Sequence, residues 1–229
     1  AVEYNKKLLG NVVLTDPFDP EAVEKQNEDY DNILNIAGNG VMGAVEIPSI
    51  DVYLPIYHGT DSKSLEKGAG HLENSSFPVG GKGTHSIISA HTGLPSAKMF
   101  DNLTEVKEGD IFYIHVLNRT LAYEVNQIKV VLPENISDLL INKNRDYVTL
   151  ITCTPYGINS HRLLVRGERI PYREAKKKDK SESKINNMWK AYAFVGVLAV
   201  VLIILLWYYY RIRLKKKKAR KKQVRRNEK

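Results

Sequence analysis

A stretch of twenty residues without a charged side chain, Ala191–Tyr210, constrains this chain more than any other feature. An α-helix rises about 1.5 Å per residue, so twenty residues span roughly 30 Å, the thickness of the hydrocarbon core of a bilayer. Trp189 stands before the stretch and Trp207 lies near its far end, as aromatic residues at membrane interfaces do. The alternative is a buried helix of a soluble core, which rarely carries such flanks. We therefore predict a transmembrane helix over residues 191–210.

A basic tail follows the uncharged stretch. Residues 211–229 hold twelve Lys and Arg and one Glu, whereas residues 1–210 hold 22 basic and 25 acidic side chains. Basic residues beside a span stay in the cytoplasm, which places residues 1–190 outside the cell. A nucleic-acid-binding domain would spread its basic residues over a folded face, so we expect no nucleic acid partner and a tail that contacts anionic membrane lipid. The chain begins at Ala1, and we expect that a signal or a second anchor was removed.

Residues 39–172 have the pattern of β-strands. Short β-branched and aromatic runs are separated by turn residues; they include HSIISA, IFYIHVL, LAYEVNQIKVV, YVTLITC and RLLVRGERI. The pattern predicts a mostly-β closed barrel with short helical inserts at 96–103 and 134–140. Residues 173–190 are polar and lack apolar periodicity, so we expect a linker between the barrel and the span.

Residues 1–38 are expected to form an N-terminal helical segment interrupted by the sequence TDPFDP. Two prolines three positions apart end the first helix. Asp19 fits the N-cap of a second helix, with Pro20 at its first helical position. The second helix should end before Gly38.

Three polar side chains lie where predicted strands begin or end. Cys153 closes the run YVTLITC, Arg162 opens the run RLLVRGERI, and His91 follows the run HSIISA. If these strands are neighbours, a thiol, a guanidinium and an imidazole meet at one end of the sheet. Each residue also has a plain structural interpretation, since a lone Cys is more often a small buried hydrophobe and His91 is one of six histidines. No histidine stands at ligand spacing from another His, Cys or carboxylate, so we expect no metal site and no cofactor.

The segments around these residues resemble the sortase family of cysteine transpeptidases. YVTLITCTPYGINSHRLLVRGERI resembles the sortase signature, in which Thr-Leu-x-Thr-Cys ends one strand and an Arg follows in the next. SIISAHTGLPSAKMFDNL resembles the family's histidine segment, and EIPSIDVYLPIYHGT resembles its opening strands, in the right order over about residues 41–170. The resemblance implies a sortase-type closed barrel in which Cys153 is the nucleophile, His91 the general acid and base, and Arg162 the residue that stabilises substrate and oxyanion.

The interruption TDPFDP resembles the lid of class C sortases, which polymerise pilins. Its Asp-Pro-aromatic triplet is Asp16-Pro17-Phe18. A C-terminal membrane span is also typical of that class. Many such lids carry Trp or Tyr, whereas Phe18 lacks a hydrogen-bonding end. The triplet has a plain interpretation as a proline-containing loop between two helices with Asp16 as a turn residue. The functional interpretation is that Asp16 pairs with Arg162 and that Phe18 lies against the sulfur of Cys153.

The reaction implied by the resemblance is acyl transfer at a Gram-positive cell surface. Cys153 would cleave an LPxTG-like sorting signal between Thr and Gly, and a lysine of another pilin subunit would accept the acyl group. We expect cationic His91 and Arg162 to favour the thiolate. Two alternatives stay open. One is a sortase that attaches surface proteins to a cell-wall precursor, and the other is a non-enzymatic, membrane-tethered binding module with a structural Cys153.

Overall fold

The computed structural model describes residues 1–8, 14–19, 28–94, 97–179, 192, 194–196 and 207. The chain divides into two compact units, Ala1–Lys178 and Asp179–Lys229. In the second unit every described position is helical. Residue 179 is the last of the helical run that begins at residue 172. The predicted transmembrane helix and basic tail lie almost wholly outside the described residues. No helix built from residues that the structure describes is both long and apolar enough to cross a membrane.

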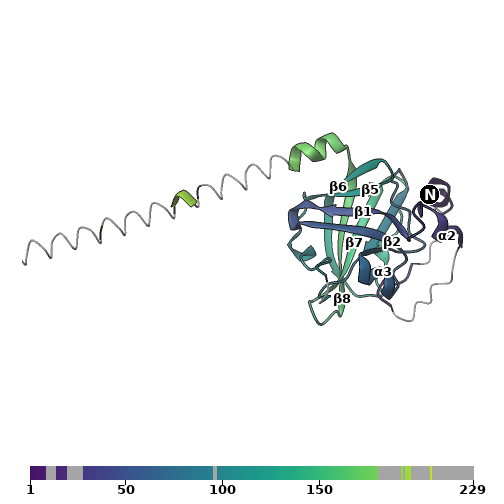
Figure 1. The fold of residues 1–229 in the computed structure, drawn as a ribbon, viewed down its shortest axis with the longest axis horizontal. Coiled ribbons are helices and arrows are strands. Elements are labelled where there is room, and N and C mark those ends of the chain that lie inside the picture. Colours follow the sequence, from purple (N-terminus) through teal and green to yellow (C-terminus); the bar gives the residue numbers. More distant parts are fainter. Residues whose placement is uncertain are drawn as a thin grey trace, which may run out of the picture. The chain divides into compact units, whose positions relative to one another are not determined.

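A closed β-barrel forms the body of the first unit (Figure 1). Neighbouring strands follow one another around the barrel in the order β1-β2-β3-β4-β7-β8-β6-β5. The strands are β1 Val41–Ile47, β2 Val52–His58, β3 Ala69–His71, β4 Thr84–Ser89, β5 Ile111–Val116, β6 Arg119–Val131, β7 Asp146–Thr154 and β8 His161–Ile170. The prediction of a mostly-β closed barrel is confirmed.

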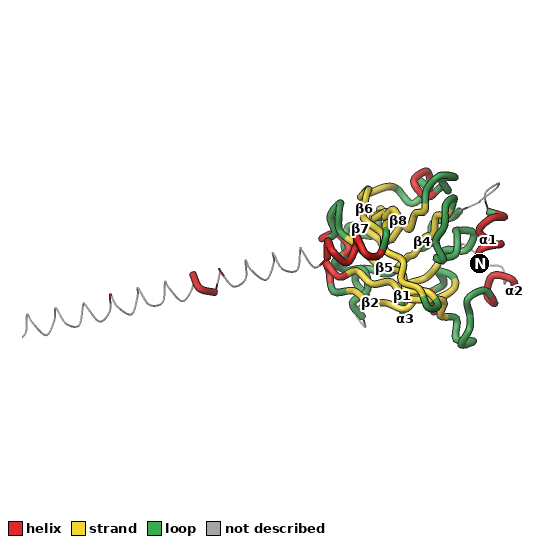
Figure 2. The backbone as a smooth tube through the Cα atoms, turned by 90° about the horizontal axis from the view of Figure 1, so that it is seen from above, coloured by secondary structure: helices red, strands yellow, loops and turns green. Residues whose placement is uncertain are grey.

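Short helices lie around the strands (Figure 2). They are α1 Val2–Lys7, α2 Glu28–Asn32, α3 Ser62–Lys67 and the 3-10 turns η1 Pro48–Ile50, η2 Leu103–Glu105 and η3 Ser137–Leu139. The helical insert predicted at 134–140 is reduced to the single turn η3, because a short helix gains too few hydrogen bonds to offset its nucleation. The insert predicted at 96–103 is wrong over residues 97–102, which are not helical, and η2 begins only at residue 103. Helix α3 was not predicted. Asp61 caps it by accepting hydrogen bonds from the backbone N–H groups of Lys63 and Ser64 at 2.7 and 3.1 Å.

The start of the predicted linker is part of the barrel unit. Residues 172–179 are helical rather than extended. Ala175 is fully buried in a small cluster with Ile111, Tyr113 and Ala122 of β5 and β6. The ring of Tyr172 also lies 6.0 Å from that of Tyr113, and Lys178 forms an ion pair with Glu124 at 2.7 Å. The polar composition of the segment gave no sign of this helix, because Ala175 is its only fully buried apolar residue among those described.

The N-terminal segment is tied to the barrel on both sides of the Asp-Pro-Phe triplet. Asn5 of α1 donates from Nδ2 to the carbonyl of Phe77 at 3.0 Å and accepts from its N–H at 2.7 Å. The Tyr30 hydroxyl of α2 donates to the carbonyl of His71 at 2.9 Å and accepts from the N–H of Gly59 at 3.0 Å. The triplet therefore stands in the sequence between two segments that are both held on the barrel.

Candidate active site

His91, Cys153 and Arg162 lie at the same end of three neighbouring strands. Strand β7 runs between β4 and β8. Cys153 of β7 is directly opposite Arg162 of β8 in their antiparallel pair. The parallel pairing of β4 with β7 ends at Ser89 opposite Ile151, so two residues further along both strands His91 and Cys153 reach the same level. The register therefore brings the three side chains to one edge of the sheet.

All three side chains belong to the outer face of the barrel. Side chains alternate between the two faces of a strand, and Ile87, Ile151 and Leu164 pack in an apolar cluster separate from the barrel core. His91, Cys153 and Arg162 each stand two or four positions from one of these residues on the same strand. We call this group the outer cluster. It comprises Leu14, Leu72, Ile87, Leu139, Ile151 and Leu164, with Phe18, Val131 and Ile136 packed against it.

Asp16 forms a two-pronged ion pair with Arg162. The Arg162 Nε donates to Oδ1 at 2.9 Å, and Nη2 donates to Oδ2 at 2.6 Å. The third nitrogen, Nη1, donates to the backbone carbonyls of Asn159 and His161 at 2.9 and 3.1 Å. All three nitrogens of the guanidinium thus have partners. Paired donors of this kind fix the orientation of the carboxylate as well as its distance.

The ring of Phe18 lies near both Arg162 and His91. Its ring centroid is 5.2 Å from Cζ of Arg162 and 5.9 Å from the ring centroid of His91. The first distance is within the range of a cation–π contact. The ring thus covers the site from the N-terminal segment. Its expected contact with the sulfur of Cys153 stays a prediction.

Leu14 is a residue of the N-terminal segment that packs near the site and that the sequence reasoning missed. It is 7% exposed and packs in the outer cluster with Ile87 and Ile151. Leu14 stands two positions before Asp16, and an apolar residue so close to the triplet was the available signal. The N-terminal loop is therefore held over the site by apolar packing in addition to its ion pair. Pro17 is buried as well.

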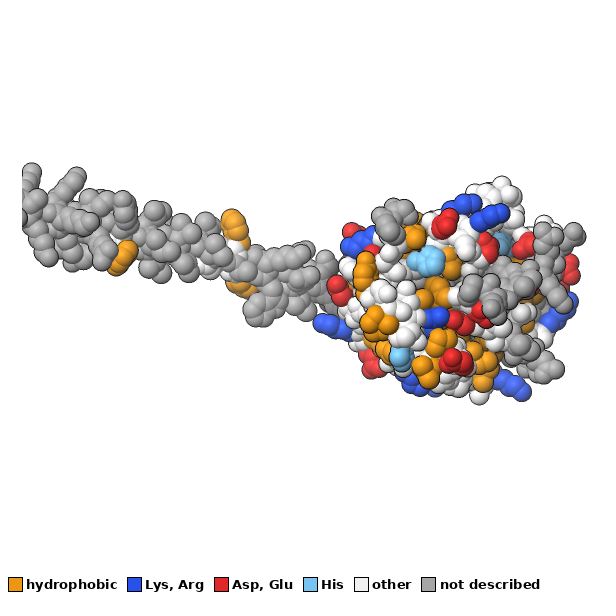
Figure 3. All heavy atoms as spheres, turned by 90° about the horizontal axis from the view of Figure 1, so that it is seen from below, with side chains coloured by type: hydrophobic (Ala, Val, Ile, Leu, Met, Phe, Trp, Pro, Cys, Tyr) orange, Lys and Arg blue, Asp and Glu red, His pale blue; other side chains and the backbone are white. Residues whose placement is uncertain are grey.

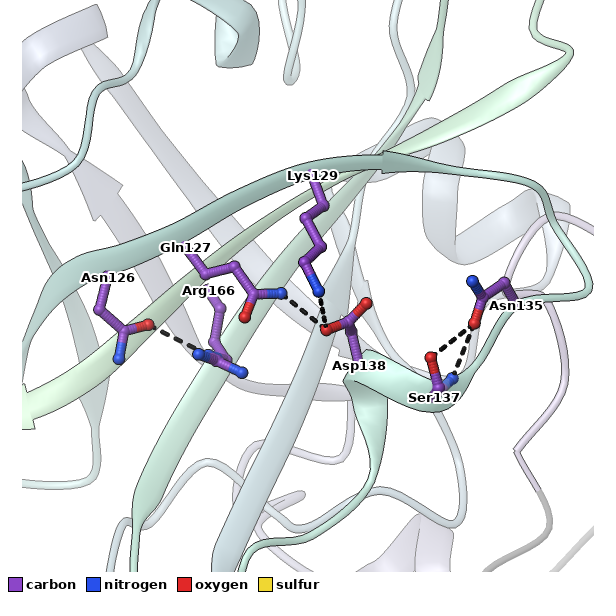
Figure 4. Close-up of polar contacts among 7 residues, drawn as sticks. All are labelled: Asn126, Gln127, Lys129, Asn135, Ser137, Asp138 and Arg166. Carbon is purple, nitrogen blue, oxygen red and sulfur yellow. Dashed lines mark hydrogen bonds and ion pairs between the residues drawn. The ribbon is translucent and has the colours of Figure 1, made fainter.

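The loop between β6 and β7 covers the outer cluster from another side, since it supplies Ile136 and Leu139. Figure 4 shows how this loop is fixed to β6. Asp138 of η3 accepts hydrogen bonds from Nζ of Lys129 at 2.6 Å and from Nε2 of Gln127 at 2.8 Å. The hydrogen bond from Lys129 is the largest of the effects that lower the pKa of the Asp138 carboxyl.

Burial shifts the pKa values of Cys153 and His91 toward their uncharged forms. Burial raises the pKa of the Cys153 thiol, Arg162 opposes that rise, and Asp16 adds to it. Burial lowers the pKa of His91, and Glu66 opposes the decrease. We expected a cationic His91 beside a thiolate. Burial under the N-terminal loop instead favours a neutral imidazole and a protonated thiol.

Other histidines serve the structure. His71 and His85 are buried, and burial lowers the pKa of each to about 4. His85 contacts the carbonyl of Leu140 at 3.0 Å and Oγ1 of Thr149 at 2.7 Å, which places it within the packing between β4, β7 and the loop before β7. Over the ranges that the structure describes, no group of three or more His, Cys, Asp or Glu side chains is placed to hold a metal ion.

Charges of both signs are scattered over the face of the molecule seen in Figure 3, with apolar side chains between them. Basic side chains do not gather into a single patch on that face.

The comparisons with known proteins agree on one family. Residues 45–170, more than half of the chain, match the family model described as "Sortase domain". The crystal structure of sortase C-1 from Actinomyces oris has a TM-score of 0.70 and 52% sequence identity, covering 74% of this chain and 94% of that one. The structure titled "Pilus-related Sortase C of Group B Streptococcus" has a TM-score of 0.68 and 43% identity, covering 75% of this chain and 88% of that one.

A curated relative, sortase D of Bacillus subtilis (strain 168), is 29% identical over 131 residues, which are 56% of this chain and 63% of that protein. The chain spans between 47% and 63% of the length of the curated relatives it matches. The family model and the barrel geometry coincide over β1 to β8, including the strand ends that carry His91, Cys153 and Arg162. The chain belongs to the sortase family.

Proposed function

We propose that this protein is a cysteine transpeptidase that polymerises pilins. It cleaves an LPxTG-like sorting signal between Thr and Gly and transfers the new carboxyl terminus to a lysine side chain of another pilin subunit. The observation that carries this proposal is the paired hydrogen bonding of Asp16 to Arg162, which closes an N-terminal lid over the site. Similarity to two structures named sortase C, one of them described as pilus-related, supports the same class.

The first half-reaction begins when the sorting signal displaces the lid. The Cys153 thiol passes its proton to His91, and the thiolate attacks the carbonyl carbon of the Thr–Gly bond. Arg162, released from Asp16, donates hydrogen bonds to the developing oxyanion. Protonated His91 then gives its proton to the leaving amine of Gly. The products are a thioester on Cys153 and a free glycine amine.

The second half-reaction uses the same residues in reverse. The neutral amine of the acceptor lysine attacks the thioester carbonyl, and His91 takes the proton that the amine loses. Collapse of the intermediate expels the Cys153 thiolate, which regains a proton from His91. An isopeptide bond joins the two subunits. Because water would compete for the thioester, a site that is covered between turnovers suits this chemistry.

The location proposed for the enzyme follows from its charge distribution. Helix 191–210 lies in the bilayer, the barrel lies outside the cell, and the basic tail 211–229 contacts lipid in the cytoplasm. Protease added to intact protoplasts should digest residues 1–190 and spare a tag placed after Lys229. Digestion of the tag would reverse this orientation.

Mass spectrometry with an LPxTG-type peptide tests the activity. Wild-type protein should gain the mass of the acyl fragment on Cys153, and the Cys153→Ala variant should gain nothing while keeping its fold. Adding either a pilin with an acceptor lysine or a wall-peptide amine then separates pilin polymerisation from wall anchoring. A thiol that forms no adduct and resists alkylation would favour the non-enzymatic binding module.

A further inference from the structure

Ser89, the last residue of β4, carries a buried hydroxyl without a partner. Its exposed fraction is 0%, and among the residues that the structure describes no atom forms a hydrogen bond with its Oγ. The large majority of buried polar side-chain atoms in native proteins have a hydrogen-bond partner, because an unpaired one loses its interactions with water and gains none. A hydroxyl left unpaired in this position therefore needs an explanation.

The hydroxyl lies on the face of β4 that the lid covers. Ser89 stands two residues after Ile87 in β4, so these two side chains share the outer face, and His91 follows two residues beyond the end of the strand. Ile87 packs in the outer cluster with Leu14, and the ring of His91 lies 5.9 Å from that of Phe18. Leu14 and Phe18 of the N-terminal segment therefore pack near the two positions that flank Ser89 in the sequence.

A second unpaired hydroxyl on the same strand provides a contrast. Ser86 is 2% exposed, and its Oγ also has no partner among the residues described. Ser86 is on the opposite face of β4, with Ile88 and Ala90 of the barrel core. A substrate on the outer face cannot reach it. Of these two unpaired hydroxyls, only that of Ser89 is on the face of β4 that carries the outer cluster.

We propose that Ser89 binds the substrate by donating a hydrogen bond to a main-chain carbonyl of the sorting signal, upstream of the bond that is cleaved. This inference rests on the proposed function. The lid covers the hydroxyl in the free protein, and the peptide that replaces the lid supplies the missing acceptor. Such a contact involves no side chain of the peptide. It would therefore hold the peptide in register over the site without restricting the variable residue x of LPxTG.

The spacing of the strands identifies the carbonyl. Ser89 is opposite Ile151, so Cys153 lies two residues further along the strand direction, about 6.6 Å away along it. An extended peptide advances about 3.3 Å per residue, so with the Thr carbonyl at Cys153 the residue near Ser89 is two positions earlier. In LPxTG that residue is Pro. Proline has no N–H and offers only its carbonyl as a main-chain partner, which matches a hydroxyl that donates.

The test compares Ser89→Ala with Ser86→Ala in the full chain. Each variant loses one unpaired buried hydroxyl from β4, so both should keep a melting temperature equal to or above that of the wild type. Only Ser89→Ala should slow formation of the thioacyl adduct from an LPxTG peptide. We expect kcat/KM to fall about three- to tenfold, mostly through KM, because one neutral hydrogen bond to the bound peptide is lost.

A peptide with a thiocarbonyl in place of the Pro carbonyl isolates the contact. Sulfur is a weaker acceptor, so the thiocarbonyl peptide should react more slowly than the ordinary one with the wild type and with Ser86→Ala. With Ser89→Ala the two peptides should react alike, which completes a double-mutant cycle. Equal kcat/KM in all three proteins, or an unchanged effect of the thiocarbonyl in Ser89→Ala, would overturn the proposal while leaving the transpeptidase function intact. A wild type that forms no adduct with any LPxTG peptide would overturn both.

Discussion

Asp16 occupies two of the three guanidinium nitrogens of Arg162, and the backbone of the loop after β7 occupies the third. The two side chains are only 13% and 11% exposed, so water screens the pair weakly. In this state Nε and Nη2 of Arg162 both donate to Asp16. If Arg162 stabilises an oxyanion as proposed, Asp16 must first separate from it, and this separation would link access to the thiol with activation of the site.

Removing the lid contacts should expose the thiol. We expect replacement of both Asp16 and Phe18 by Ala to raise the rate at which a small maleimide alkylates Cys153 by about ten- to a hundredfold. This factor is the inverse of an open population of roughly 1–10% in the wild type. The melting temperature of the barrel should change by only a few degrees, because both residues lie outside its core.

The pH dependence of alkylation separates access from acidity. Asp16 raises the pKa of Cys153, so its loss should move the rise of the rate with pH toward lower pH. Better access alone would multiply the alkylation rate by the same factor at every pH. A lower pKa of Cys153 would add a further increase at pH values below that pKa, where more of the thiol becomes thiolate. Equal rates for wild type and double variant over the whole pH range would show that the triplet is only a connector.

Leu14 should hold the lid through apolar packing alone. Replacing it with Ser removes a buried side chain from the outer cluster, a loss of about 1.5–3 kcal/mol for full burial. Part of that loss goes into lid opening, so we expect alkylation of Cys153 to increase several-fold while the ion pair partners remain. Ile36→Ser is the matched control, since Ile36 is 80% exposed and its loss should leave the rate unchanged. If both variants react at the wild-type rate, Leu14 has no part in closing the lid.

The barrel was predictable because its signal is distributed along many strands. Each run alternates or is continuously apolar over several residues, and the turns between runs are rich in Gly and Asp. The places of His91, Cys153 and Arg162 at strand ends followed from the same pattern. That β7 lies between β4 and β8 came from the structure, because strand order depends on contacts between segments distant in sequence.

The features that sequence reasoning missed depend on a few side chains. The helix of residues 172–179 contacts the barrel through the buried Ala175, the ring of Tyr172 and the ion pair of Lys178 with Glu124. One Asp61 side chain caps α3. The lowered pKa of His91 was missed for another reason. A pKa depends on how deeply the group is buried, and the sequence does not reveal that the Phe18 ring lies 5.9 Å from the imidazole.

Arg162 should be sensitive to a substitution that keeps its charge. Arg162→Lys retains one positive charge but loses the planar set of donors, and removing one oxyanion donor typically lowers the rate on the order of 10²–10³-fold. We expect a decrease of that order in transpeptidation, and a similar or larger one for His91→Ala. The control is Arg166→Lys on the same strand, where the guanidinium lies 4.5 Å from the Tyr147 ring, away from the thiol. Near wild-type turnover by Arg162→Lys would mean that Arg162 acts only as a diffuse charge.

Stability should fall in mild acid because of two buried histidines. Burial lowers the pKa of both His71 and His85 to about 4 in the folded state, against about 6.5 in the unfolded chain. Between these values the unfolded chain binds more protons than the folded one, so the free energy of unfolding decreases as pH falls. Each histidine contributes up to one proton to the difference between the two states. A difference of one full proton changes the free energy of unfolding by about 1.4 kcal/mol per pH unit. Asp146, whose pKa is raised by burial, acts in the opposite sense at lower pH.

Urea unfolding at several pH values between 7 and 4.5 measures this slope. We expect a nearly constant free energy of unfolding near pH 7 and a decrease that approaches two protons per molecule around pH 5. His85→Gln should remove about one proton from that slope, since Gln keeps a side chain that can donate or accept but does not titrate. His161→Gln is the control, because His161 lies at the start of β8, bonded to Ser160, and the two buried histidines stay intact. A wild-type free energy that stays flat from pH 6 to pH 5 would mean that His71 and His85 bind protons in the folded barrel as readily as in the unfolded chain.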